Sequence, residues 1–264
     1  MRYSDDMSQP LHGLRVVIPR AEGRGNSLAA RLRELGAEPV LYPVITYAAP
    51  EDLAPLQTAV QRLMQNEFDW LVLTSVRAVR AVRDRIAQSD PIPGSLSTKI
   101  AAVGPATAAA CVSQLHQTPA AMPDVFTADA LPTVMGELHG QRVLLLNADI
   151  APPGLQQALQ KAGAQVERVI AYRTIRAQDN AVDMPALLRT HAVHAILFTS
   201  GSTVRYFVER VGPALFDAVC KLTIVCIGPN TAAVVQALGL RPAAVATAAT
   251  EDGLIKALMA AFNN

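Results

Sequence analysis

W-L-V-L-T-S at 70–75 and I-A-A-V-G-P-A-T at 100–107 are two segments of this 264-residue chain that return later in similar form. The echoes are A-I-L-F-T-S at 195–200 and I-V-C-I-G-P-N-T at 224–231. Thr-Ser recurs at an offset of 125 residues, and Gly-Pro recurs at an offset of 124. Solenoid repeats have periods of about 20–50 residues, so self-similarity at this longer period predicts two duplicated domains.

Each repeated segment is a short apolar run that ends in small polar residues and is followed by a helical pattern. Apolar runs without alternation are typical of strands that are covered on both faces, as in parallel sheets. In such α/β sheets the ligand lies at the carboxyl ends of the strands. We therefore expect a ligand beside the Thr-Ser and Gly-Pro turns.

The duplication extends outward from these segments. Arg15–Pro19 is expected to be a strand, and 26–35 a helix that stops at Gly36. The same pattern returns at 142–163, at an offset of 127 residues. The extended stretches L-Y-P-V-I-T-Y at 41–47 and R-V-I-A-Y-R-T at 168–174 are rich in β-branched and aromatic residues, and we interpret them as crossings between the two domains.

Composition favours a two-domain α/β protein, because 264 residues with 51% hydrophobic side chains can bury two cores. No apolar run approaches the roughly 20 residues that span a bilayer, and Met1–Gly13 is too polar for a signal peptide. We expect a cytoplasmic protein that binds no membrane. The net charge is +1 and no basic stripe is present, so no nucleic acid is expected as a partner.

The three cysteines, Cys111, Cys220 and Cys226, show no C-x-x-C spacing, which favours reduced thiols. His191 and His194 are three residues apart, but no further cysteine or carboxylate cluster completes a metal site around them. The sequence therefore predicts no bound metal.

Several motifs in a fixed order resemble the uroporphyrinogen-III synthase family over about residues 14–262. They are R-V-V-I-P-R at 15–20, L-x-x-L-G-A-E-P at 32–39, L-V-L-T-S at 71–75, V-G-P-A-T at 103–107, a Tyr at 172 after L-x-x-A-G-A, F-T-S at 198–200, I-G-P-N-T-A at 227–232 and A-T-E-D-G-L at 249–254. Each motif alone is weakly specific, whereas the ordered set is fairly specific.

The resemblance implies an enzyme without a cofactor, a uroporphyrinogen-III synthase. Such an enzyme cyclises linear hydroxymethylbilane to uroporphyrinogen III with loss of water and inversion of ring D through a spiro intermediate, in an interdomain cleft. It also implies two flavodoxin-like or Rossmann-like α/β domains with parallel sheets, joined by a two-stranded β connector. Domain 1 would comprise 1–42 plus 174–264, domain 2 would comprise 47–168, and the connectors would be 43–46 and 169–173.

The substrate of this family carries a carboxylate on every acetate and propionate arm, whereas the chain is nearly neutral. Helix N-termini offer unpaired N–H donors and a partial positive charge, and four of them are expected to follow Ser75, Gly104, Ser200 and Gly228. The candidate substrate-binding residues at these turns are Thr74, Ser75, Gly104, Thr107, Thr199, Ser200, Gly228 and Thr231. The alternative for each hydroxyl is a helix cap that binds no ligand.

Three arginines and one tyrosine are further candidates. Arg20 matches the family's usual arginine at the end of the first strand, although it could equally be a surface residue. Arg80 and Arg205 repeat at an offset of 125 and could meet carboxylate arms, although helix-surface charges are more often only solvated. Tyr172 matches the family's tyrosine that is proposed to assist the departure of water, since a phenol is protonated at neutral pH and can donate. Its alternative role is packing.

The loop after V-L-L-L at 143–146 departs from the family. Many members continue with two arginines, whereas this chain reads N-A-D-I-A-P-P-G at 147–154, which leaves open whether the altered loop reduces activity. A non-catalytic tetrapyrrole- or anion-sensing module on the same fold is the alternative function. A periplasmic-type binding protein would need an export signal, and a nucleotide-dependent enzyme would need a glycine-rich phosphate motif. We expect a monomer that acts on a small molecule.

Overall fold

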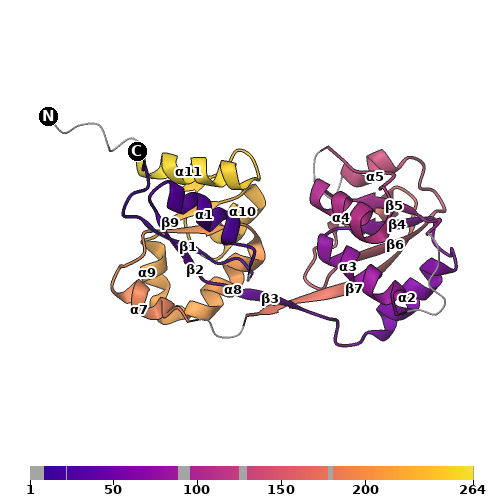
Figure 1. Ribbon diagram of the computed structural model, residues 1–264, viewed down its shortest axis with the longest axis horizontal. Helices are drawn as coiled ribbons and strands as arrows, with labels where there is room; N and C mark the ends of the chain where they lie inside the picture. The colour runs from indigo at the N-terminus through magenta and orange to yellow at the C-terminus, as the bar shows by residue number, and fades with distance from the viewer. Residues whose placement is uncertain (1–8, 22, 89–95, 125–129, 178–180, 264) are drawn as a thin grey trace. The chain divides into compact units, whose positions relative to one another are not determined.

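The computed structural model describes residues 9–21, 23–88, 96–124, 130–177 and 181–263 (Figure 1). The chain divides into two compact units, each with its own five-stranded sheet. Unit 1 comprises Met1–Thr46 and Ile175–Asn264, and unit 2 comprises Tyr47–Thr174. Unit 1 is therefore built from both ends of the chain.

The sheet of unit 1 has the strand order β10-β9-β8-β1-β2, and each pair of neighbours with a recorded register is parallel. Its strands are β1 (Arg15–Ile18), β2 (Glu38–Leu41), β8 (Ala195–Phe198), β9 (Thr223–Cys226) and β10 (Ala244–Val245). Its helices are α1 (Asn26–Glu34), α7 (Met184–Arg189), α8 (Gly201–Val211), the 3₁₀ helix η1 (Pro213–Leu215), α9 (Phe216–Cys220), α10 (Pro229–Ala237) and α11 (Glu251–Asn263).

Helices cover both faces of this sheet, which explains why its strands are continuously apolar. On one face Val16 and Ile18 pack with Leu28 of α1 and Leu254 of α11. On the other face Phe198 lies edge-on to Phe207 of α8, with 5.8 Å between ring centroids. Figure 1 shows α1 and α11 on one side of the strands and α7 and α9 on the opposite side.

The sheet of unit 2 has the order β3-β7-β6-β4-β5, and the pairs from β7 to β5 are parallel. Its strands are β3 (Ile45–Ala48), β4 (Trp70–Leu73), β5 (Lys99–Ala102), β6 (Arg142–Ala148) and β7 (Gln165–Arg176). Its helices are α2 (Ala54–Met64), α3 (Val76–Ile86), α4 (Pro105–Leu115), α5 (Ala130–Met135) and α6 (Gly154–Lys161). α2, α3 and α4 pack on one face around Leu71 and Leu73, and α5 and α6 pack on the other around Trp70 and Val72.

The two units have the same architecture but a different chain order. β9-β8-β1-β2 in unit 1 corresponds to β5-β4-β6-β7 in unit 2. The opening β1-α1-β2 segment joins a sheet whose other strands come from the end of the chain, whereas β6-α6-β7 follows the other elements of unit 2. The sequence repeat is thus not the folding unit. The prediction of an α/β protein with two parallel sheets is confirmed.

β3 and β7 are neighbours in the sheet of unit 2, and each contains a boundary between the units. The extended stretch 41–47 is interrupted around Pro43, since β2 ends at Leu41 and β3 begins at Ile45. Proline cannot donate a ladder hydrogen bond, which accounts for the break. None of the helices in the described part of the chain has the length and apolarity needed to cross a membrane.

Candidate functional site

The Thr-Ser and Gly-Pro turns of unit 2 lie at one edge of its sheet, because β4 and β5 are adjacent and parallel. Ser75 is the N-cap of α3, and its Oγ accepts a hydrogen bond from the Ala78 N–H at 3.2 Å. Gly104 is the N-cap of α4, in extended backbone with φ −166° and ψ 167°. Both helices therefore begin at the carboxyl ends of neighbouring strands, where the N–H groups of the first turn that bind neither the cap nor the turn can meet an anion.

Unit 1 repeats this geometry at β8 and β9, which are also adjacent and parallel. Ser200 caps α8 by accepting from the Thr203 N–H at 3.3 Å. Gly228 caps α10 in the same extended backbone, with φ −178° and ψ 174°. The predicted residues thus divide into two sets, one in each unit. Thr74, Ser75, Gly104, Thr107 and Tyr172 are in unit 2, and Arg20, Thr199, Ser200, Gly228 and Thr231 are in unit 1.

Several of the predicted side chains are buried or are bonded to other groups of the protein. Thr107 and Thr231 are only 5% exposed, so little of either hydroxyl faces solvent. Arg20 donates from a guanidinium nitrogen to the Glu251 carboxylate, at 2.5 Å, in the first turn of α11. Thr74 donates its hydroxyl hydrogen to the Leu146 carbonyl at 3.4 Å, a long and weak bond.

Tyr172 lies on β7 and is held by contacts within unit 2. Its side chain is hydrogen-bonded to that of Ser75. The ring of Tyr47 packs edge-on against it, with 5.8 Å between centroids and 70° between planes. The guanidinium carbon of Arg77 lies 3.3 Å from the centroid of the Tyr47 ring, so the arginine stacks on the tyrosine that supports Tyr172.

Burial raises the pKa of Tyr172 above its ordinary value. The hydrogen bond from Ser75 opposes this rise in pKa, as does the positive charge of Arg77 to a smaller extent. Tyr47 and Asp149 act in the same direction as burial. The phenol is therefore protonated at neutral pH and can act as a proton donor.

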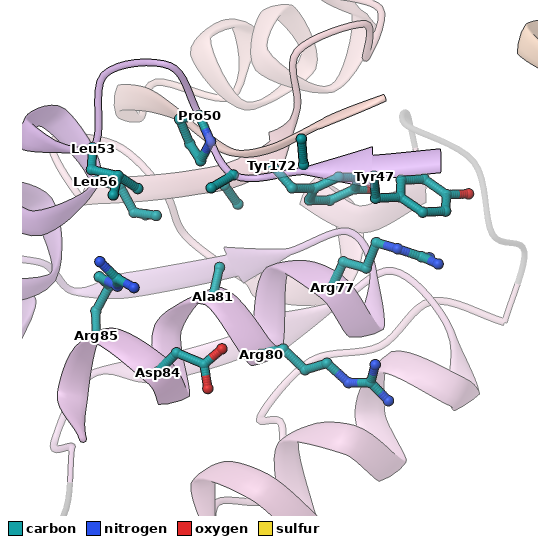
Figure 2. Close-up of a pocket in the computed structure, with 13 residues that line it drawn as sticks. Tyr47, Pro50, Leu53, Leu56, Arg77, Arg80, Ala81, Asp84, Arg85 and Tyr172 are labelled. Carbon is teal, nitrogen blue, oxygen red and sulfur yellow. The ribbon is translucent and has the colours of Figure 1, made fainter. Parts of the chain in front are cut away.

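A pocket of about 280 Å³ opens beside Tyr172, entirely within unit 2 (Figure 2). One wall is a face of α3 that carries three arginines and an aspartate, and the other comprises the chain from Tyr47 to α2. Its lining residues are Tyr47, Ala48, Ala49, Pro50, Leu53, Leu56, Arg77, Arg80, Ala81, Asp84, Arg85, Ala171 and Tyr172.

The sequence motifs indicate Tyr172 and Arg80 as candidates but give no indication of Tyr47, Arg77 and Arg85, which also line this pocket. The available signal was V-R-A-V-R-A-V-R-D-R-I at 76–86, where arginines recur every two or three residues directly after Thr-Ser. Tyr47 carried no such signal, because only the adjacency of β3 and β7 brings it against Tyr172.

The loop that departs from the family pattern is held by Arg168 of β7. Its Nε donates to Asn147 Oδ1 at 3.2 Å, and a terminal nitrogen donates to the Ala151 carbonyl at 2.8 Å. Asp149 Oδ1 accepts from the Thr174 N–H at 2.9 Å. The loop is thus fastened to the same strand that carries Tyr172. Among the described residues, no three His, Cys, Asp or Glu side chains are grouped to bind a metal ion.

Comparisons with known proteins agree on one family. A family model described as "Uroporphyrinogen-III synthase HemD" matches residues 26–256. The uroporphyrinogen-III synthase of Synechococcus elongatus is 31% identical over 255 residues, which cover 95% of this chain and 96% of that protein. A mutant uroporphyrinogen III synthase from Thermus thermophilus has a TM-score of 0.65 at 20% identity, covering 95% of this chain and 99% of the other. The enzyme of Helicobacter pylori gives 0.61 at 15% identity, with 94% and 99% covered, and both structures share the fold.

Proposed function

The chain belongs to the uroporphyrinogen-III synthase family, and we propose that it cyclises linear hydroxymethylbilane to uroporphyrinogen III with inversion of ring D. The observation that carries this proposal is the match to a uroporphyrinogen-III synthase across nearly the full length of both chains. The family resemblance predicted from the ordered motifs is thereby confirmed.

Tyr172 is our candidate for the proton donor. The C–O bond of the hydroxymethyl group breaks as the phenol donates its proton to the leaving hydroxyl, which departs as water. The adjacent pyrrole nitrogen supplies the electron pair that stabilises the resulting carbon. The substituted carbon of ring D then attacks this carbon and forms the spiro intermediate. A protonated phenol beside the arginine-lined pocket supports this role.

The turns of both units are our candidates for binding the carboxylate arms. The N-termini of α3, α4, α8 and α10 offer backbone N–H donors. Thr74 and Ser75 precede α3, and Thr199 and Ser200 precede α8. Gly104 and Gly228 cap α4 and α10. Thr231 would contribute through its backbone N–H, since its side chain is buried, whereas the N–H of Thr107 donates to the Gly104 carbonyl at 3.0 Å, so Thr107 would help to shape the turn. Arg20 would exchange Glu251 for a substrate carboxylate.

Conformational restraint supplies a further part of the rate. Holding ring D against the reactive carbon replaces a loose chain by a near-attack geometry, which can contribute several kcal/mol, up to roughly 7–11. Arrangement of the bilane also decides which carbon of ring D attacks. We propose that the protein works as a cytoplasmic monomer without a metal or coenzyme and without a nucleic-acid partner.

The test is to supply hydroxymethylbilane to the purified protein and separate the product isomers by chromatography after oxidation to porphyrins. We expect the type III isomer, formed much faster than spontaneous closure. Spontaneous closure gives the type I isomer. Type I alone at the uncatalysed rate would contradict the proposal and favour the non-catalytic sensing module.

A further inference from the structure

One face of α3 presents an unusual density of positive charge to the pocket. The lining residues of this helix are spaced i, i+3, i+4, i+7 and i+8, which places them on one stripe: Arg77, Arg80, Ala81, Asp84 and Arg85. The acidic member is not a free negative charge, because Arg83 donates to Asp84 Oδ1 from Nε at 2.9 Å and from a terminal nitrogen at 2.5 Å. The face therefore carries three guanidinium groups and one carboxylate that is paired with Arg83.

The opposite wall of the pocket is apolar. Ala48, Ala49, Pro50, Leu53 and Leu56 line it from the end of β3 to the first turn of α2. Figure 2 shows Tyr47, Tyr172 and Arg77 at one end, and Leu53, Leu56 and Arg85 at the other. The pocket therefore combines a charged wall with an apolar wall. The combination matches a flat apolar ring that carries anionic arms.

The size of the pocket limits how much of such a ligand it holds. About 280 Å³ is just below the roughly 300–1,000 Å³ of pockets that enclose a drug-sized ligand. A four-ring bilane is too large, whereas one pyrrole with its acetate and propionate arms is a fragment of suitable size. Tyr172 lines the same pocket, so the ring held there would be the one whose substituent receives the proton.

We propose that this pocket binds the terminal pyrrole that carries the hydroxymethyl group, with the ring against Pro50 and Leu53 and its carboxylate arms on Arg80 and Arg85. The assignment rests on the proposed function for the identity of the ring, but not for the chemistry of the pocket. We assign such a pocket to unit 2 alone. Arg210 of α8, which corresponds to Arg85 at the offset of 125, donates to the carbonyls of Pro43 and Ala177 instead.

The experiment titrates the full-length protein with porphobilinogen, a monopyrrole with one acetate and one propionate arm, followed by ligand-observed NMR. Wild type is expected to show saturable binding. The double variant Arg80→Gln/Arg85→Gln is expected to bind at least about 10-fold more weakly, since each charge-assisted hydrogen bond contributes that order of affinity. Leu53→Glu, which places a negative charge on the apolar wall, is expected to lose binding as well.

The matched control is Arg241→Gln, which removes one exposed arginine from unit 1 and leaves the pocket unchanged. It is expected to bind like wild type. Fluorescence of Trp70, the single tryptophan, checks that unit 2 of each variant is folded. Absence of saturable binding to wild type, or equal binding by a folded double variant, would overturn the assignment.

Product analysis separates this inference from the proposed function. If wild type forms the type III isomer while porphobilinogen binding is insensitive to Arg80 and Arg85, the function stands and the pocket assignment fails. If wild type binds porphobilinogen through these arginines but forms no type III isomer, the monopyrrole site stands and the enzymatic role fails. With both correct, the double variant still makes type III and its KM rises at least about 10-fold.

Discussion

α3 of unit 2 and α8 of unit 1 are counterparts that begin alike and then differ. Their N-cap serines have nearly the same backbone angles, φ −161° and ψ 158° for Ser75 and φ −167° and ψ 156° for Ser200. Beyond the cap, the α3 face lines a pocket. The α8 face instead fastens its own unit: Arg210 donates to two backbone carbonyls and lies 5.1 Å over the Tyr42 ring. Glu209 pairs with Arg176 at 3.4 Å.

This difference distinguishes residues that shape the fold of both units from residues that could take part in the reaction. Residues that both halves repeat, such as the Thr-Ser and Gly-Pro turns, set the helix N-termini in the same way in each unit. Residues that are not repeated make the two units unequal. At the offset of 127, Tyr172 corresponds to Ile45, and at the offset of 125, Arg77 corresponds to Ser202. The candidate proton donor and its supporting contacts therefore belong to unit 2 alone.

Tyr172→Phe gives the largest expected effect. The ring and its packing against Tyr47 are kept, whereas the proton donor is lost, so we expect kcat to fall by about 100-fold, the low end of general acid catalysis. The type III isomer should still form, because arrangement of the bilane does not need the phenol. Steady-state kinetics with product analysis measure both. A fully active variant would leave Tyr172 a packing residue.

The matched control is Tyr206→Phe, which removes a hydroxyl from α8 at the position that corresponds to Ala81 of α3. We expect its kcat to equal that of wild type. The pH profile adds a second readout for Tyr172. Burial raises the pKa of this phenol, so loss of its proton, and with it the alkaline decline of kcat, is expected only above about pH 10.

Tyr47→Leu tests whether the stack unique to unit 2 positions Tyr172. An edge-on aromatic pair contributes about 0.5–1.5 kcal/mol. Because leucine loses both this pair and the ring on which Arg77 stacks, we expect kcat to fall by up to about 10-fold. Tyr47→Phe keeps the ring and should restore kcat to near the wild-type value. If leucine and phenylalanine were equivalent, the ring contact would have no positioning role.

Ser75→Ala and Ser200→Ala test the scaffold that the units share. Each loses one N-cap, which costs about 1 kcal/mol of stability in its own unit. Urea denaturation distinguishes them, because Trp70 fluorescence reports unit 2 and only Ser75→Ala should lower that midpoint. Ser75→Ala should also lower kcat several-fold, since it removes the hydrogen bond to Tyr172. Equal effects of the two variants on kcat would contradict the prediction that only unit 2 carries the proton donor and its hydrogen-bond partner.

Much of the fold was predictable from the repeat. Continuous apolar strands such as 143–146, and glycine after a helix at Gly36 and Gly163, have a direct physical basis: burial on both faces, and positive φ of 87° and 91°. No local sequence pattern indicates that β1-α1-β2 joins the sheet whose other strands come from the end of the chain. This expectation came from the family resemblance, because strand partners more than 150 residues apart are set by the whole fold.

The site was less predictable for a similar reason. Ser75 and Tyr172 lie in motifs, but their hydrogen bond depends on β7 bringing residues 97 positions apart together. Arg20, expected at a ligand, lies against Glu251, for which the sequence indicates only the start of a helix. Pairings of this kind arise from packing between distant elements, which sequence periodicity does not encode.

The smallest expected effects concern two buried thiols, whose modification rates report the stability of each unit separately. Cys111 in α4 and Cys226 in β9 are both fully buried, and burial raises the pKa of each to about 11. Each thiol favours the folded state fully below its unfolded pKa of about 8.5, and this contribution is lost as the pH rises through about 11. At pH 8 a disulfide reagent should modify Cys220 at once, because this thiol is exposed. Because Cys111 and Cys226 are buried, the reagent should reach each of them only when its own unit opens.

The rates of the two slow phases, assigned by mass spectrometry, then measure each unit separately. Ser75→Ala should accelerate modification of Cys111 about 5-fold, the factor that corresponds to roughly 1 kcal/mol, and leave Cys226 unchanged. Ser200→Ala should do the reverse, because Cys226 lies on β9 beside the strand that leads into Ser200. Equal acceleration of both thiols by either variant would mean that the units open as one, and the stabilities of the two copies would then not be separable.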